Sequence, residues 1–339
     1  MTYNVKTEWV LRPGDPPDLN AEFDSEETVK HIELALEENG CEVVRIGSAR
    51  HLLEQNGKVK KVDIVFNIAE GFGGRNRESQ VPILLEMLGI PFVGADGLTL
   101  GLTLDKVLTK KVLIAEDIPT PKYFEVTDFN RLSMEKLRYP LFVKLRSEGS
   151  SKGLTEKSLV NNLEELQHQV KHLMNTYKEA SIFVEEFIEG QEFTVAVIGN
   201  ENPTVYPVVQ IALDGVTDLG KKFFSWRYLR TGSDYVCPAP IPEKMAKKMQ
   251  EIALRTYQVV ECRDFGRVDF RTDKQGNPYV LEINPLPSLS DQDVFNFICK
   301  TQGMTHHGMI HHILETALER YGMKTKPKKA GALSATRSH

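Results

Sequence analysis

The segment YVLEINPLPSLSD (residues 279–291) sets two polar side chains in an otherwise apolar strand. A strand buried on both faces is almost entirely Val, Ile and Leu, but this one carries Glu282 and Asn284 before it enters a proline-rich loop. Residues two apart in a strand share a face, so these two side chains point the same way. Their placement therefore indicates a binding role for that face.

A second strand, FGRVDFR (265–271), precedes this one across the turn DKQGN, and the pair predicts a hairpin. Arg267 and Asp269 also share a face, so all four polar side chains are expected on one surface. Carboxylate and amide oxygens beside an arginine suit Mg²⁺ that bridges nucleotide phosphates. The alternative is a salt bridge between Arg267 and Glu282 on an exposed sheet face, which is the commoner arrangement for two such strands taken alone.

The composition is that of a globular protein and excludes several classes of function. The chain has 339 residues, 41% hydrophobic and 26% charged, which suggests two or three domains. Its net charge of -5 argues against nucleic acid as a partner, and no apolar run approaches the roughly 18 residues of a membrane helix. The N-terminus lacks a secretory signal, so we expect a cytoplasmic protein. Its cysteines, without a CxxC pair, are expected as free thiols: Cys41, Cys237, Cys262 and Cys299.

The first hundred residues alternate helical and strand patterns, which indicates a parallel sheet covered by helices. Asp24 and Glu27 have the spacing of a capping box ahead of a helix that Gly40 closes. The other elements expected here are a strand at 41–46, a buried strand at 61–71 that enters a glycine-rich loop, and a helix followed by a strand within 79–94.

The rest of the chain predicts an α+β arrangement with antiparallel strands. Apolar stripes predict helices at 104–115, 163–177 and 245–260, and YPLFVKL (139–145) predicts a strand. IFVEEFI (182–188) and EFTVAVIG (192–199) flank a Glu-Gly turn, which predicts a second hairpin.

Several further segments suit phosphate binding, although each is weak alone. Lys144 ends a strand and is followed by EGSSKG (148–153), whose backbone N–H groups can fold over phosphate oxygens. This is not a Walker A motif, and a polar turn is the plain alternative. Lys106 begins a helix and by itself would be a solvated lysine. EEFIEGQE (185–192) alone would be an acidic edge.

The order of these pieces is more informative than any one of them. They run DK (105–106), VK (143–144), EGSS (148–151), VEEFIEGQEF (184–193), RVDF (267–270) and EINPLP (282–287). In this order they resemble the ATP-grasp superfamily and, within it, the D-alanine–D-alanine ligase family, over about residues 60–320. The resemblance implies an N-terminal Rossmann-like (pre-ATP-grasp) α/β domain at 1–102 and a two-part ATP-grasp fold. Its central lid subdomain would span 103–188 and its C-terminal subdomain 189–322, followed by a disordered basic tail at 323–339.

The resemblance also implies a nucleotide site and a metal site. Lys106 and Lys144 would contact ATP, and Ser150 and Ser151 would lie in a loop that closes over the triphosphate. Adenine would be held by Glu185, Glu186, Phe187 and Ile188, and the ribose by Glu192. Two Mg²⁺ ions, with Mn²⁺ as an alternative, would be ligated by Asp269, Glu282 and Asn284.

Further residues would act on the reacting groups. Arg267 would stabilise a tetrahedral oxyanion. In the implied closing loop at 223–240, Tyr228 would hydrogen-bond Ser150, and Arg227 takes the place of a lysine that touches the γ-phosphate.

The implied reaction is amide formation between a small-molecule carboxylate and a small-molecule amine. The carboxylate attacks the γ-phosphate to give an acylphosphate and ADP, and the amine then displaces phosphate. Phosphoryl transfer needs positioning and charge neutralisation, and the acylphosphate needs protection from water. The resemblance further implies a homodimer. A D-alanine–D-alanine ligase proper and a catalytically silent Mg-ATP-binding regulator are the alternatives.

The chain departs from the family around the first substrate. Glu27 is the best candidate for the glutamate that holds the ammonium of the first amino acid. The loop NIAEGFGGRNRESQ (67–80) replaces the family's His-Gly loop, and we expect it to contact substrate because it follows the carboxyl end of a parallel strand. Surface charge is the alternative for the charged residues it adds, which are Glu70, Arg75, Arg77 and Glu78.

The acceptor side also differs, since Ser288 and Asp293 take the places of a family glycine and serine. At about 4 Å and an effective dielectric of about 20, a carboxylate at 293 would repel an acceptor carboxylate by about 4 kcal/mol. We therefore expect another amino acid, a peptide or a basic metabolite rather than free D-alanine. His307 and His311 have a metal-binding spacing, but an ordinary helix face is expected there.

Overall fold

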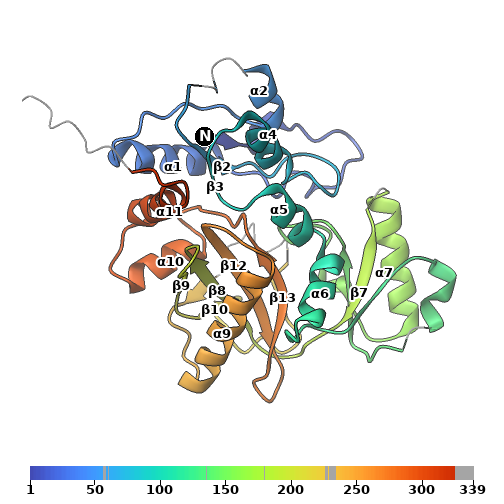
Figure 1. Cartoon of the computed structure of the whole chain (residues 1–339). Coiled ribbons are helices and arrows are strands. Elements are labelled where there is room, and N and C mark those ends of the chain that lie inside the picture. Colours follow the sequence, from blue (N-terminus) through green and yellow to red (C-terminus); the bar gives the residue numbers. More distant parts are fainter. Residues whose placement is uncertain are drawn as a thin grey trace, which may run out of the picture.

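Figure 1 shows the computed structural model of the chain, which describes residues 1–55, 59, 61–134, 136–178, 180–225, 228 and 234–324. Three sheets organise these residues: a parallel sheet of order β1-β2-β3, a four-stranded sheet of order β4-β7-β5-β6, and a six-stranded sheet of order β11-β10-β8-β12-β13 in which β9 pairs with β8. No helix among these residues is long and apolar enough to cross a membrane.

The N-terminal domain is built on the parallel sheet expected from its alternating pattern. β1 (Thr2–Tyr3) pairs with β2 (Val65–Ile68), which pairs with β3 (Phe92–Val93). Its helices are α1 (Glu26–Glu38), α2 (Ala49–Glu54), α4 (Gln80–Leu88) and α5 (Gly97–Leu104). The helix and strand expected within 79–94 are confirmed.

Two local expectations in this domain are wrong. The cap of α1 is Ser25, whose side chain accepts from the Thr28 N–H, and not Asp24. Residues 41–46 do not form a regular strand, although the Ile46 N–H donates to the Met1 carbonyl. The neighbouring β1 is only two residues long, so it offers no extended ladder to this segment.

The four-stranded sheet lies in the region 103–188 that the family resemblance implies as a lid subdomain. Its strands are β4 (Tyr123–Glu125), β5 (Leu141–Leu145), β6 (Leu159–Val160) and β7 (Ile182–Glu186). The predicted helix α7 (Leu163–Thr176) packs Leu166, Val170 and Leu173 into the lid core. The helix α6 (Lys106–Ala115) leads into this sheet, with short 3₁₀ turns at Phe129–Met134 and Glu156–Ser158.

The six-stranded sheet is the centre of the C-terminal part (Figure 1). It contains β8 (Glu192–Ile198), β9 (Thr204–Val205), β10 (Val209–Ala212), β11 (Asp234–Val236), β12 (Phe265–Thr272) and β13 (Pro278–Asn284). The predicted helix α9 (Glu243–Val259) buries its Met249, Ile252 and Tyr257 stripe against this sheet. The hairpin expected from the opening segment is confirmed, because β12 and β13 pair antiparallel.

The second expected hairpin is wrong, since β7 and β8 belong to different sheets. β7 pairs with β4 and β5, whereas β8 pairs with β10 and β12. The turn between them packs on the end of β12, where a side chain at Gly190 would collide with the Thr272 carbonyl. The glycine therefore permits close backbone approach instead of a tight hairpin turn.

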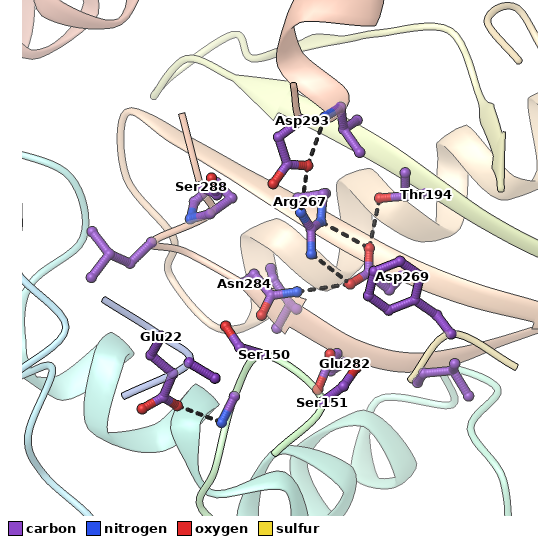
Figure 2. A pocket seen from close by; sticks show the side chains of 18 of the residues that line it. Glu22, Ser150, Ser151, Thr194, Arg267, Asp269, Glu282, Asn284, Ser288 and Asp293 are labelled. Atoms are coloured by element: carbon purple, nitrogen blue, oxygen red, sulfur yellow. Dashed lines mark hydrogen bonds and ion pairs between the residues drawn. The ribbon is translucent and has the colours of Figure 1, made fainter. Parts of the chain in front are cut away.

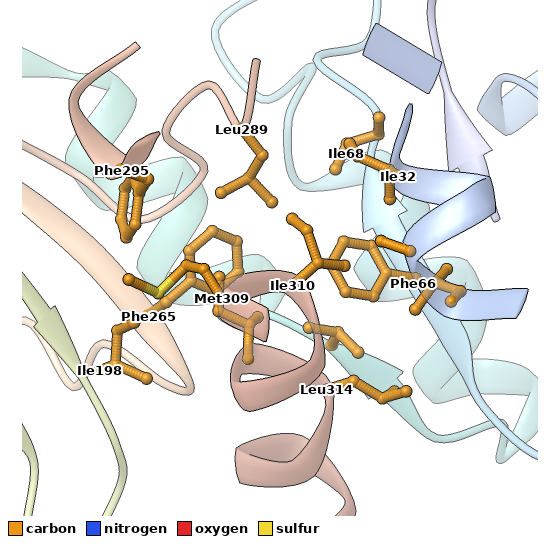
Figure 3. Packing of buried hydrophobic residues seen from close by; sticks show 14 of the residues in the cluster. Ile32, Phe66, Ile68, Ile198, Phe265, Leu289, Phe295, Met309, Ile310 and Leu314 are labelled. Carbon is orange, nitrogen blue, oxygen red and sulfur yellow. The ribbon is translucent and has the colours of Figure 1, made fainter. Parts of the chain in front are cut away.

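The last helices join the two ends of the chain. α10 (Val294–Thr301) is followed by α11 (His306–Arg320), which packs on α1. Figure 3 shows Met309, Ile310 and Leu314 of α11 between Phe66 of β2 on one side and Phe265 of β12 on the other. Burial of each such side chain stabilises the fold by about 1.5–3 kcal/mol, so this cluster fixes the N-terminal domain to the large sheet.

The cysteines and histidines behave as expected. All four cysteines are free thiols. His307 Nδ1 lies 2.6 Å from Glu38 Oε2, and His311 Nε2 lies 3.1 Å from Glu315 Oε1, so both pair on the surface of α11. Within the described ranges, no cluster of three or more His, Cys, Asp or Glu side chains could hold a metal ion.

Candidate active site

A cavity of about 530 Å³ lies where the three sheets meet. Most of the site residues expected from the sequence line it, although they come from segments far apart in the chain. The lining includes Glu27, Glu70, Lys106, Lys144, Ser150, Ser151, Glu185, Glu186, Phe187, Ile188, Glu192, Tyr228, Arg267, Asp269, Glu282, Asn284, Ser288 and Asp293. Arg75 is not among the lining residues, and Arg227 lies outside the described residues.

The β12–β13 hairpin supplies the floor of this cavity (Figure 2). Asp269 stands opposite Glu282 in the register, and Arg267 stands opposite Asn284. The Asn284 Nδ2 group donates to Asp269 Oδ2 at 2.8 Å, and the Thr194 hydroxyl on β8 donates to Asp269 Oδ1 at 2.6 Å. The polar residues of the two strands therefore do meet on one surface.

The ion pairs on this surface differ from the alternative considered above, in which Arg267 would pair with Glu282 across the two strands. Arg267 pairs with Asp269, with Nε 3.0 Å from Oδ1, rather than with Glu282. Glu282 Oε2 lies 3.1 Å from Lys106 Nζ at the start of α6. Lys106 also donates to the Glu148 carbonyl at 2.6 Å, so it links the hairpin to residues 147–154, which carry Ser150 and Ser151 and are called the serine loop here.

The two facing carboxylates have opposite pKa shifts. Burial raises the pKa of Asp269, and the nearby charge of Glu282 adds to this rise although Arg267 opposes it. Burial alone would raise the pKa of Glu282 too, but Lys106 and Lys144 outweigh it and hold the pKa below its usual value. Two crowded carboxylates with an amide beside them fit the oxygen set that a divalent cation prefers.

A second charged group lies on the lid side and includes a residue that the sequence analysis missed. Glu185 on β7 accepts from two lysines, Lys144 on β5 and Lys110 on α6, with each Nζ 2.7 Å from a carboxylate oxygen. The side chain of Lys110 is only 1% exposed. Burial would raise the pKa of Glu185, but the two lysines lower it to about 2. The signal for Lys110 was its position one turn after Lys106 on the same helix.

An aromatic slot adjoins this charged group. Phe142 and Phe187 have ring centroids 5.6 Å apart, and Phe223 meets Phe142 edge to face at 4.6 Å. The Arg271 guanidinium lies 4.6 Å from the Phe187 ring centroid. Flat apolar faces beside a cation suit a planar, electron-rich ring system.

Arg271 also organises the outer end of the slot. Its Nη1 lies 2.8 Å from Glu192 Oε2, and its Nε donates to the Ile188 carbonyl at 2.7 Å. Glu186 also lines the cavity and accepts from the Arg138 N–H at 3.2 Å. The motifs in the sequence therefore indicated Phe187, Ile188 and Glu192 but gave no sign of Arg271, which contacts all three.

The serine loop is held to the N-terminal domain by a buried carboxylate. The Gly149 N–H donates to Glu22 Oε1 at 2.6 Å, and a side chain at Gly149 would lie 2.8 Å from that oxygen. Glu22 also pairs with Arg77 and with Lys152, whose Nζ is 3.1 Å away. Ser150 and Ser151 follow with φ angles of 47° and 54°, a left-handed conformation that costs serine about 1–2 kcal/mol per residue.

The remaining expected residues have less central places. Glu27 is exposed in the first turn of α1, and Ser288 is exposed in the loop after β13. Arg75 is exposed and pairs with Asp105 Oδ2 at 2.9 Å, whereas Arg77 two residues later is buried. The Tyr228 hydroxyl donates to Asp214 Oδ2 at 3.0 Å, where the family resemblance implied Ser150.

Asp293 is partly neutralised by its surroundings. It caps α10 by accepting from the Val294 N–H at 2.6 Å, and its Oδ1 lies 3.5 Å from Arg267 Nη1 (Figure 2). The repulsion of about 4 kcal/mol expected from the sequence assumed a carboxylate without partners, so the repulsion in this arrangement is smaller.

Comparisons with known proteins agree with the arrangement of the sheets. The family model described as D-ala D-ala ligase C-terminus matches residues 113–315. The chain is 38% identical to the uncharacterized protein y4sG of Sinorhizobium fredii, over 76% of this chain and 75% of that one. It is 34% identical to a D-alanine–D-alanine ligase of Carboxydothermus hydrogenoformans, over 84% and 90% of the two chains.

Another D-alanine–D-alanine ligase, from Desulforudis audaxviator, is 33% identical over 84% of this chain and 91% of its own. Among solved structures, a D-alanine–D-alanine ligase from Bacillus anthracis complexed with ATP superimposes with a TM-score of 0.71. That match covers 95% of this chain and 97% of the other at 23% identity, and it shows a common fold.

Proposed function

This chain belongs to the D-alanine–D-alanine ligase family of ATP-grasp proteins, and on that premise we propose that it is an ATP-dependent ligase that joins a carboxylate to an amine. The observation that carries the proposal is the surface on which Asp269 and Glu282 face each other, with Arg267 and Lys106 as their cationic partners. Such a surface, open to a cavity of about 530 Å³, suits a triphosphate and the groups that react with it.

The proposed nucleotide site runs from the aromatic slot to the serine loop. Adenine would lie beside Phe187, and Glu192 would accept from the ribose hydroxyls. Lys144 and Lys106 would face the phosphates, with the backbone of Ser150 and Ser151 above them. Support comes from the fact that all these residues line the same cavity.

Asp269, Glu282 and Asn284 would hold Mg²⁺, and we propose two ions, with Mn²⁺ able to replace them. Bound there, the ions would neutralise the charge of the phosphate oxygens. The fit of the site rests on its donor set and on the raised pKa of Asp269, which burial and the neighbouring Glu282 charge cause.

The reaction would proceed in two steps. A substrate carboxylate oxygen would bond to the γ-phosphorus of ATP while the bond to the β,γ-bridging oxygen breaks, which gives an acylphosphate and ADP. The amine nitrogen would then bond to the acyl carbon, lose a proton, and displace inorganic phosphate. Arg267 would stabilise the oxyanion of the tetrahedral intermediate because Asp269 holds its guanidinium towards the cavity floor.

Two features of the chain would protect the acylphosphate. The serine loop is fixed over the cavity by Glu22, and Tyr228 supplies a wall from the opposite segment. Exclusion of water from this space would limit hydrolysis of the intermediate. From family membership alone we also propose that the chain acts as a homodimer.

The products are proposed to be amides of amino acids or related small molecules. D-alanine as both donor and acceptor is the second candidate, because the ion pair of Asp293 with Arg267 weakens the repulsion that would exclude an acceptor carboxylate. A panel of paired amino acids, in both chiralities, tests the proposal by release of ADP and by mass spectrometry of the product.

A ligase releases ADP only when both substrates are present, and it yields the condensed product with loss of one water in mass. Efficient turnover with D-alanine alone would identify the second candidate. If the protein binds Mg-ATP yet releases no ADP with any pair, the ligase proposal is wrong for the tested classes and a silent regulator is favoured.

A further inference from the structure

Glu78 differs from the other buried acidic residues of the described chain. Five of them have strong donors: Asp18, Asp105, Glu185, Glu192 and Asp264. The residue Glu78 is 9% exposed and lines the cavity, but its side chain has no hydrogen bond and no ion pair within the ranges that the structure describes. The Glu78 carboxylate is therefore largely withdrawn from bulk solvent, with the cavity as its open side, and a hydrogen-bond donor on a ligand there would stabilise it.

The nearest cations are committed elsewhere. Arg77 contacts Glu22, and Lys106 contacts Glu282, so both act on Glu78 only at longer range. Burial, with Glu22 and Glu282 nearby, raises the pKa of Glu78 to about 7. An additional positive charge beside Glu78 would restore its ionised form at neutral pH.

Two more carboxylates line the cavity and form no ion pair with any residue that the structure describes. Glu70 follows β2, and burial together with the charge of Glu78 raises its pKa well above the usual value. Asp24 precedes α1, and burial together with the charge of Asp293 across the cavity raises its pKa to about 7. The exposed Lys6 is the cation that faces Asp24. We call Asp24, Glu70 and Glu78 the acidic wall.

The acidic wall suits an organic cation. Ammonium and guanidinium groups pair with separate carboxylates through directional hydrogen bonds. One α-ammonium would satisfy one carboxylate and leave others of the wall unpaired.

We propose that the substrate bound against the acidic wall carries a cationic group in addition to any α-ammonium, as a basic amino acid does. This inference rests on the proposed ligase function, because only that function makes the bound molecule a substrate. It adds that Glu78 and Glu70 select that substrate by charge.

Calorimetry on the full chain with Mg²⁺ and a non-hydrolysable ATP analogue tests the inference directly. The probes are lysine, ornithine and arginine in both chiralities, and norleucine, which lacks only the terminal ammonium of lysine. The variants are Glu78→Gln and Glu70→Gln, with Glu86→Gln as a control because Glu86 is an exposed carboxylate on the adjoining helix α4.

At least one basic probe should bind about 10- to 100-fold more tightly than norleucine, and Glu78→Gln should remove most of that preference. Glu86→Gln should leave it unchanged. ADP release with the same probes should show the effect as a raised KM for the basic substrate with kcat retained, whereas a purely structural role would weaken all ligands, including the ATP analogue.

Equal binding of norleucine and the basic probes would overturn the inference, as would a charge preference that survives in the Glu78→Gln, Glu70→Gln double variant. Selective binding of a basic probe without ADP release from any acid and amine pair would leave this inference standing and reject the ligase function. The two proposals therefore fail separately.

Discussion

Lys110 and Lys144 hold the two oxygens of one carboxylate, with each Nζ 2.7 Å from Glu185. One lysine comes from helix α6 and the other from strand β5, so Glu185 ties these elements together beneath the cavity. Lys110 also donates to the Thr120 hydroxyl at 2.7 Å, which fixes it in place. Lys110 is therefore a positioning residue that holds Glu185 for Lys144.

Substitutions of Glu185 and Lys110 should lower the free energy of unfolding by very different amounts. Glu185→Gln leaves two buried ammonium groups without a carboxylate and should lower the free energy of unfolding by about 3–5 kcal/mol. Lys110→Met keeps the aliphatic stem and leaves a neutral Lys144–Glu185 pair, so it should cost about 1 kcal/mol. Urea denaturation of the two variants gives the comparison, and an equal loss in both would contradict the shared-carboxylate arrangement.

The facing carboxylates of the hairpin should be required for catalysis and not for folding. Asp269→Asn and Glu282→Gln should each lower kcat for ADP release by about 100- to 1,000-fold, because each removes a proposed ligand of the Mg²⁺ that would neutralise the phosphates. Asp273→Asn, in the turn between the same strands, is the matched control, since Asp273 bonds to Gln275, Asn277 and Tyr279 and is not among the residues that line the cavity. Unchanged kcat in Asp269→Asn would remove this hairpin from the mechanism.

Arg77 and Arg75 offer a matched pair two residues apart. Arg77→Met deprives the buried Glu22 of a partner and should destabilise the protein on the order of 3 kcal/mol while exposing the 147–154 loop to proteases. Arg75→Met should cost less than about 1 kcal/mol, because Arg75 is exposed and Asp105 keeps Arg146. Limited proteolysis and thermal unfolding report both effects. Equal behaviour of the two variants would show that the Glu22 link does not hold the loop.

Stability without substrate should fall as pH rises through neutrality. Asp24 and Glu78 have folded pKa values of about 7, above their usual values, so their contribution is complete at low pH and is lost as pH rises through 7. The melting temperature of Glu78→Gln relative to the natural protein should therefore be higher at pH 8 than at pH 5.

Glu22 and Glu185 affect the pH dependence of stability in the opposite direction. Their folded pKa values are about 2, so the stability they provide is present above about pH 4.5 and is lost as pH falls towards 2. Thermal scans from pH 3 to pH 8 separate the two effects. A melting-temperature difference between Glu78→Gln and the natural protein that does not change with pH would argue against a raised pKa at this position.

The sequence predicted the β12–β13 hairpin correctly because alternation and a short turn are local signals that both strands satisfy. The same reasoning failed for β7 and β8, which also flank a short glycine turn. Nothing local reveals that these strands have their partners in separate sheets, as β7 has in β5 and β8 has in β12. Tertiary pairing overrides the turn in such a case.

The same limit applies to the site. Lys106, Lys144 and Glu282 stand in recognisable motifs, and sequence analysis named them. Glu22 was missed because its partners Arg77 and Lys152 lie 55 and 130 residues away in the chain, so its burial depends on how domains pack. Individual charged residues carry no periodic signal that would separate such a buried ion pair from a surface one.

The link from Glu22 to Gly149 has a consequence for timing. The serine loop cannot swing away from the N-terminal domain without breaking a hydrogen bond to a carboxylate that two cations also hold. Product release would then be slower than the chemical steps, as is common in enzymes whose active-site loop must open before the product leaves. A variant with a weaker bond between Glu22 and the serine loop would then turn over faster, and more of its acylphosphate would be lost to hydrolysis.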